Sequence, residues 1–126
     1  MEQDKVLQVF EALSSTVRLD AFRLLVRAGG GGCVAGEIAA ALALPPNNLS
    51  FHLKALTQSG LVTVEQEGRF QRYRANIRLM LDTVAYLMEN CCGDNPQACA
   101  ELRGGMFTLT PIFESAQATS GEDGAA

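Results

Sequence analysis

The chain has 126 residues, of which 48% are hydrophobic, and a formal net charge of −4. This length suits one domain with a single core, and no apolar run reaches the roughly 20 residues that a membrane-spanning helix needs. The first residues lack a basic segment followed by an apolar one, so we expect a cytoplasmic protein with no membrane contact. In that reducing compartment, four cysteines favour metal binding over a disulfide framework.

The charge is unevenly distributed along the chain. Residues 47–78 hold five basic and two acidic side chains, whereas residues 79–126 hold one basic and seven acidic ones. A basic segment within an acidic chain is typical of contact with phosphate groups, although a merely solvated basic face has the same composition.

Helical periodicity organises the first third of the chain. A first helix is indicated by apolar residues at helical spacing that we expect to face inward, namely Val6, Val9, Phe10 and Leu13. Ser14 or Ser15 can cap a second helix, which ends in the glycine run 29–32.

Two more helices follow, joined by a short turn. The third covers roughly residues 34–42, and Pro46 suits the first turn of a fourth helix that ends near Gly60. Two short helices joined in this way form the helix-turn-helix arrangement.

The fourth helix has an apolar and a polar side. Its leucines form one stripe at 100° per residue, and the opposite side carries the candidates for DNA contact, which are Asn47, Asn48, Ser50, Phe51 and Lys54. Asparagine can pair with adenine and lysine suits a phosphate. Phe51 can press on a thymine methyl or a sugar, unless it lies at the edge of the core. His52 falls beside the leucine stripe, which favours a hydrogen-bonded structural role over a base contact.

A β-hairpin is predicted next. Residues 61–67 and 70–75 read as two strands around a tight, glycine-containing turn. One face of such a wing can pack on the domain through Tyr73. Basic residues at the tip and on the other face are candidates for phosphate contact, and they are Arg69, Arg72 and Arg74.

A final helix over about residues 77–90 has a broader apolar face than a small core needs, which indicates dimerisation. Directly after it stand Cys91 and Cys92, and the turn sequence 93–96 can fold Cys99 back toward them. Three thiols without a nearby imidazole suit a soft, thiophilic ion. Cys33 stands apart, and we interpret it as a small buried hydrophobic residue.

The number of thiols bears on the identity of the ion. Zinc in a closed site takes four ligands, and the fourth would have to be Asp94, Glu101 or water. Trivalent arsenic or antimony needs only three thiolates, in a trigonal pyramid, so As(III) or Sb(III) is the expected inducer. The alternatives are a soft divalent ion such as Cd(II), Pb(II) or Hg(II), a thiol redox switch, and an incidental cluster.

Two other classes of function make different demands on the sequence. An enzyme with a cysteine nucleophile and His52 as its base is excluded, because His52 belongs to the predicted DNA-binding helix and no oxyanion or organic-cofactor motif occurs. The other alternative is a protein-interaction module that uses the wing and the dimer helix. Under this hypothesis, the protein has no affinity for DNA.

The order of these motifs resembles the ArsR/SmtB family of winged-helix metalloregulatory repressors over roughly residues 6–90. The matching segments, in chain order, are Leu13–Leu25, Glu37–Ala39, Leu49–Leu56, Ser59–Val62, and Gly68-Arg69 with Tyr73. The resemblance implies a mostly α fold with a β-hairpin, that is, a dimeric winged helix-turn-helix. It also implies a homodimer that binds a palindromic DNA operator and releases it when an inducer binds.

The cysteine pattern resembles one branch of this family. Many of its arsenic sensors carry a Cys-Val-Cys motif on the third helix, but Val34 and Gly36 occupy those positions here. A minority instead has an adjacent cysteine pair after the last helix and a third cysteine a few residues on. We therefore expect an arsenic-responsive repressor with three parts, which are a DNA-binding and dimerisation domain (1–90), a cysteine segment (91–113) and a disordered tail (114–126).

Overall fold

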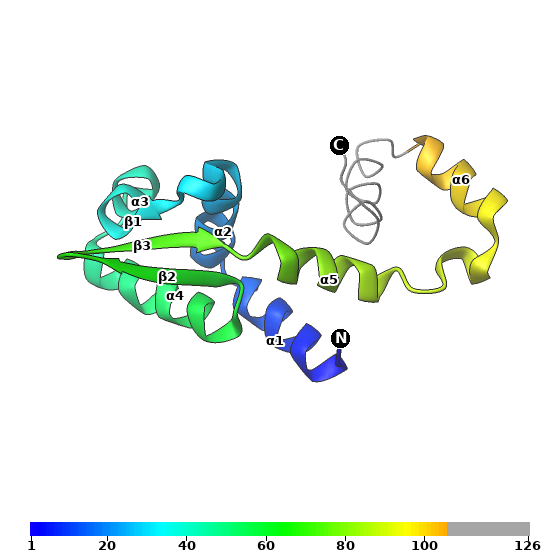
Figure 1. Ribbon diagram of the computed structural model, residues 1–126, viewed down its shortest axis with the longest axis horizontal. Coiled ribbons are helices and arrows are strands. Elements are labelled where there is room, and N and C mark those ends of the chain that lie inside the picture. Colours follow the sequence, from blue (N-terminus) through cyan, green and yellow to red (C-terminus); the bar gives the residue numbers. More distant parts are fainter. Residues whose placement is uncertain (106–126) are drawn as a thin grey trace. The chain divides into compact units, whose positions relative to one another are not determined.

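The computed structural model describes residues 1–105 of the chain (Figure 1). The helices and strands are, in order, α1 Gln3–Leu13, α2 Thr16–Ala28, η1 Gly29–Gly31, β1 Cys33–Val34, α3 Ala35–Leu42, α4 Pro46–Ser59, β2 Val62–Glu67, β3 Phe70–Ala75, α5 Ile77–Leu87, η2 Cys91–Asp94 and α6 Pro96–Gly105. The predicted tail 114–126 and the end of the predicted cysteine segment lie outside the described residues. Within residues 1–105, none of the helices has the length and apolarity to cross a bilayer.

The chain divides into two compact units, Met1–Thr83 and the part that begins at Val84. The first unit holds α1 to α4, the strands and the start of α5. The second holds the end of α5 and the three clustered cysteines. Helix α5 therefore runs from one unit into the other.

The core of the first unit is built from the helix faces that the periodicity predicts. Its fully buried side chains come from α1, α2, α3, α4 and the start of the hairpin, and include Val9, Leu25, Ile38, Leu49, Leu53, Leu56 and Val62. The leucine stripe of α4 is thus confirmed as the face that packs on the domain. Burial of one such side chain contributes about 1.5–3 kcal/mol.

Local signals fix where the helices begin and end. The hydroxyl of Ser15 accepts a hydrogen bond from the backbone N–H of Arg18, which caps α2. Pro46 stands in the first turn of α4, and Gly60 ends that helix with φ 87°, a left-handed conformation that favours glycine. The predicted bounds of α4 are therefore confirmed.

A small antiparallel sheet completes the winged helix. Strands β2 and β3 form the predicted hairpin, with Val64 opposite Tyr73. The order of the sheet is β1-β3-β2, because Cys33 and Val34 pair with Tyr73 and Arg72. In Figure 1 the hairpin tip extends beyond α3 and α4.

Two sequence-based expectations are wrong in detail. Phe10 is 44% exposed, because the core side of α1 runs through Val6, Val9 and Ala12. The last helix ends at Leu87 rather than near residue 90. The N–H of Met88 is shared between two carbonyls of the preceding turn, and the left-handed Asn90 (φ 55°) then prevents another helical turn.

Candidate functional site

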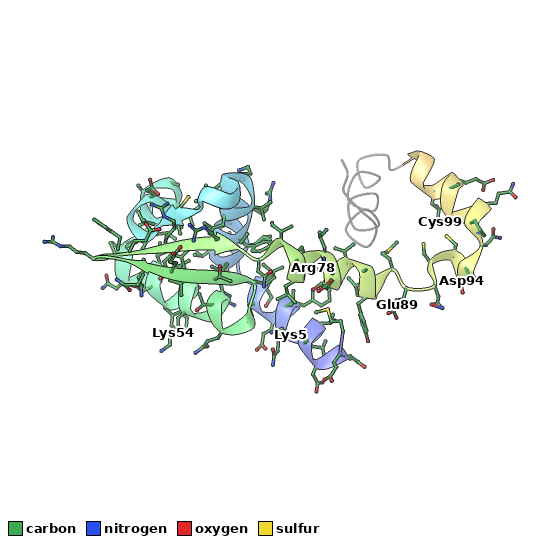
Figure 2. The ribbon with its side chains drawn as sticks, viewed as in Figure 1. Lys5, Lys54, Arg78, Glu89, Asp94 and Cys99 are labelled. Carbon is green, nitrogen blue, oxygen red and sulfur yellow. The ribbon has the colours of Figure 1, made fainter. Side chains whose placement is uncertain are left out.

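The outer face of α4 gathers all five predicted DNA-contact residues. Asn47, Asn48, Ser50, Phe51 and Lys54 are exposed, whereas the leucines on the opposite face are buried. Figure 2 shows Lys54 projecting outward from α4. An exposed helical face of this size, with amide, hydroxyl and ammonium groups, can enter a DNA major groove.

His52 is partly buried and contacts another side chain of the domain. Its Nδ1 lies 3.3 Å from Nη1 of Arg18, and Nε of Arg18 donates to the carbonyl oxygen of Ala12 at 2.7 Å. This contact agrees with the hydrogen-bonded role predicted for His52. The guanidinium joins α4 to the junction between α1 and α2.

The wing presents Arg69 at its tip. Gly68 and Arg69 form the turn between β2 and β3, and Arg69 is exposed. The side-chain amide of Gln66 donates to the carbonyl oxygen of Gly68 at 2.8 Å, which supports the turn. Arg69 is thus exposed at the tip of the hairpin, where a phosphate contact is expected.

The other two basic residues of the wing already have protein partners. Nε of Arg72 lies 3.0 Å from both carboxylate oxygens of Glu67, and its Nη1 donates to the carbonyl oxygen of Gly31 at 3.0 Å. Arg74 is bound in the same way by Glu65 and the carbonyl oxygen of Gly30, at 2.6 and 2.8 Å. The hydrogen bond to Glu67 raises the pKa of Arg72. These arginines therefore tie the glycine turn to the sheet, with only part of each guanidinium open to DNA.

The cysteine cluster is shaped by a left-handed turn. Asn90, Cys92 and Asp94 all have positive φ, between 55° and 62°, as does Gly93 between them. The backbone N–H of Cys91 donates to the carbonyl oxygen of Met88, which keeps the start of the turn at the end of α5. The chain reverses here, in agreement with the turn expected from its sequence.

Asn95 and Pro96 then start α6 and position Cys99. The side-chain oxygen of Asn95 accepts hydrogen bonds from the backbone N–H groups of Gln97 and Ala98, at 3.0 and 3.2 Å. Pro96 occupies the first helical position, where its missing N–H costs nothing. Sequence reasoning treated these two residues only as a turn. Their signal for a helix start was the asparagine cap followed by proline.

The turn and the cap bring three sulfurs together. Sγ of Cys91 lies 3.6 Å from Sγ of Cys92 and 3.7 Å from Sγ of Cys99, and all three sulfurs lie within 4.8 Å of one another. A tetrahedral metal with sulfur bonds of about 2.3 Å separates its sulfurs by about 3.8 Å. The three sulfurs of this chain are therefore spaced for a shared ion. Figure 2 shows Cys99 on α6 and Asp94 in the preceding turn.

Within the described part of the chain, no histidine or carboxylate joins the three sulfurs at ligand distance. The carboxylate of Asp94, one of the fourth ligands considered for zinc, instead lies 3.5 Å from the side-chain nitrogen of Asn90. The donor set is purely sulfur, which suits soft ions.

Cys33 lies in the other unit and takes no part in this cluster. It packs, half buried, beside the core at the start of β1. Burial raises the pKa of the Cys33 thiol, the Glu37 carboxylate adds to this, and Arg72 opposes it. Cys33 therefore packs beside the core as predicted, but it is half buried rather than fully buried.

Comparisons with known proteins agree with this architecture. A family model described as a helix-turn-helix domain matches residues 13–65. The HTH-type transcriptional regulator CmtR of Mycobacterium tuberculosis is 37% identical over 73 residues, a match that covers 58% of this chain. The matched segment covers 59% of that relative's own length.

Solved structures extend the likeness. An ArsR-like transcriptional regulator from Rhodococcus sp. RHA1 is 28% identical, with 80% of this chain and 92% of that chain covered and a TM-score of 0.60. A crystal structure of a possible transcriptional regulatory protein from Mycobacterium bovis, fragment 1–100, is 33% identical, with 65% and 91% covered and a TM-score of 0.54. The solution structure of fragment 1–100 of Mycobacterium bovis Mb0332, described as a homodimeric winged helix-turn-helix and a possible ArsR-family regulator, is 28% identical, with 68% and 84% covered and a TM-score of 0.53.

The exposed face of α4, the wing and these relatives define a winged-helix DNA-binding protein. The chain belongs to the ArsR/SmtB family, a family of transcriptional regulators and not of enzymes.

Proposed function

We propose that this protein binds operator DNA as a homodimer and releases it when a soft, thiophilic ion binds to Cys91, Cys92 and Cys99. The observation that carries the proposal is the convergence of three thiols within 4.8 Å, in a chain whose other unit is a winged helix. Such a regulator would work in the cytoplasm, where its thiols stay reduced.

The DNA-binding part of the proposal rests on α4 and the wing. Two copies of α4 in a dimer would enter successive major grooves of a palindromic operator, about 34 Å apart. Dimerisation is supported by the homodimeric Mycobacterium bovis structure and by apolar side chains left exposed on α1 and α5, which are Leu7, Phe10, Ile77 and Leu87.

The sensing part rests on the donor set. Three sulfurs, with no fourth ligand among residues 1–105, suit a soft divalent ion such as Cd(II) or Pb(II), or trivalent As(III) or Sb(III), better than a closed zinc site. Because α5 leads directly into the cysteine turn, an ion that fixes this turn can alter the end of a helix proposed to form the dimer interface. A coupling free energy of about 1–3 kcal/mol would change DNA affinity by about 5- to 150-fold.

Single cysteine variants test this assignment. Cys91→Ser, Cys92→Ser and Cys99→Ser should each retain DNA binding but lose ion-induced release, because each removes one of three sulfur ligands. Cys33→Ser is the matched control and should behave like the unmodified chain. Release is followed by fluorescence anisotropy of labelled operator during titration of the reduced protein with arsenite, Cd(II), Pb(II) and Zn(II). Normal release in one of the three variants would remove that residue from the site.

Proton counting distinguishes the two classes of ion. A divalent ion must displace protons from the thiols that it binds. Arsenite reacts as neutral arsenous acid, whose three hydroxyl groups leave as water with the three thiol protons. Calorimetry in two buffers with different ionisation enthalpies should therefore give a buffer-dependent heat for Cd(II) but not for arsenite. Equal buffer dependence for both ions would contradict arsenite binding to three protonated thiols.

A further inference from the structure

Phe51 is an aromatic side chain that lies outside the hydrophobic core. It is 69% exposed, the highest value among the large apolar side chains described, and it lies on α4 opposite the leucine stripe. The exposure shows that Phe51 is not an edge-of-core residue. Leaving a phenyl ring in water forgoes the gain of burying it in the core.

The ring is nevertheless held in a defined orientation. It packs edge-on against the ring of His52, with 5.5 Å between centroids and 73° between planes. His52 is in turn fixed by Arg18, which is bound to the carbonyl oxygen of Ala12. A chain of contacts from the first two helices therefore orients Phe51 on the outer face.

The residues around Phe51 indicate which bases the outer face of α4 can recognise. Helix α4 contains no arginine, which would read guanine, and no aspartate or glutamate, which would accept a hydrogen bond from cytosine. Its one lysine, Lys54, is assigned to a phosphate group. It does expose Asn47 and Asn48, whose amides can pair with adenine in the major groove. Thymine, the partner of adenine, differs from the other bases by an apolar methyl group in that groove.

We propose that Phe51 recognises the methyl groups of thymine, and that α4 thereby selects A·T base pairs in each operator half-site. This inference rests on the proposed function, because it assumes that α4 enters a major groove. It goes further in assigning the base that is read and the chemical group that is recognised.

The test uses duplexes selected from a random-sequence pool by the purified full chain. In the best-bound duplex, each thymine is replaced in turn by deoxyuridine, which lacks only the methyl group. Loss of one buried methyl should weaken binding by about fourfold at one or more thymines of each half-site. Phe51→Ala should bind the thymine and uracil duplexes equally. Phe70→Ala, which removes another exposed ring (61%) outside α4, should keep the discrimination.

Each outcome has a distinct meaning. Equal binding of thymine and uracil duplexes by the unmodified chain, with sequence selection intact, would overturn the inference and leave the proposed function standing. If Phe51→Ala still binds the thymine duplex more tightly than the uracil duplex, the inference is also overturned and the proposed function still stands. Weaker binding of Phe51→Ala to all duplexes, with no uracil effect in the unmodified chain, would assign the ring to the sugar-phosphate backbone and also overturn the inference. A pool from which no sequence is enriched would overturn the proposed operator binding itself.

Discussion

Arg18 shows how much one polar side chain can organise in this protein. It is separated by 34 positions from His52, yet its guanidinium bridges that ring and the carbonyl oxygen of Ala12. The position of His52 beside the leucine stripe was enough to predict a structural role from the sequence. Its partner was not predictable, because helical periodicity reports which face a residue occupies and not which residue from another helix meets it.

We expect Arg18→Met to destabilise the fold by about 1–3 kcal/mol, because it leaves the partly buried carbonyl of Ala12 and Nδ1 of His52 without their partner. Urea unfolding, followed by circular dichroism, measures the change. Arg23→Met is the control, since Arg23 is exposed on the same helix, and its effect should stay within about 0.5 kcal/mol. Equal losses in both variants would show that the Arg18 contacts do not stabilise the fold.

The three thiols were predictable at the residue level because they are close in sequence and separated by turn-forming residues. The geometry that joins them was not, since it depends on successive left-handed residues and on the cap supplied by Asn95. Positive φ at Cys92 costs roughly 1–2 kcal/mol, whereas asparagine and aspartate, as at positions 90 and 94, adopt this conformation more readily. An ion bound by all three sulfurs would offset this cost.

At the level of elements, the wing carries basic residues with two different roles. Arg69 is exposed at the tip, whereas Arg72 and Arg74 bind other parts of the protein. The sequence pattern placed Arg72 and Arg74 on one face of β3, and the structure shows that this face meets the glycine turn through Gly30 and Gly31. Strand β1, which makes this contact possible, escaped prediction because two residues are too few to show alternation. The close approach of β1 to β3 also needs Gly32. Its φ of 60° and its proximity to Tyr73 and Arg74 leave no room for a Cβ atom.

The salt dependence of DNA binding distinguishes these residues. Arg69→Ala and Lys54→Ala should each flatten the slope of log K against log salt concentration by about 0.9, the value for one lost phosphate contact. Arg72→Ala should flatten it less, because Glu67 already neutralises much of that charge. The slopes come from anisotropy titrations at several salt concentrations. A change for Arg72→Ala as large as that for Arg69→Ala would show that Arg72 exchanges Glu67 for a phosphate in the complex.

For the whole molecule, the order of motifs carried most of the information. Four helices, a glycine turn and a hairpin follow one another with short connections, and only a few compact arrangements accommodate that order. The sequence therefore predicted the winged helix. It also predicted a functional boundary at residue 90, whereas the compact units divide between Thr83 and Val84. Helix α5 crosses the boundary at Thr83, where a buried threonine hydroxyl donates to the carbonyl oxygen of Leu79.

If the cysteine cluster and the DNA-binding face are coupled, the coupling must act in both directions. An ion that weakens operator binding by a given factor must itself bind more weakly, by the same factor, to the operator-bound protein. We expect a 5- to 150-fold decrease in Cd(II) affinity, corresponding to about 1–3 kcal/mol of coupling, when saturating operator DNA is present. Competition with a chelator of known affinity measures the ion affinity in both states, and a scrambled duplex at a salt concentration that prevents its binding is the control. Equal Cd(II) affinities with and without bound operator would show that the two sites are independent, even if both ligands bind to this chain.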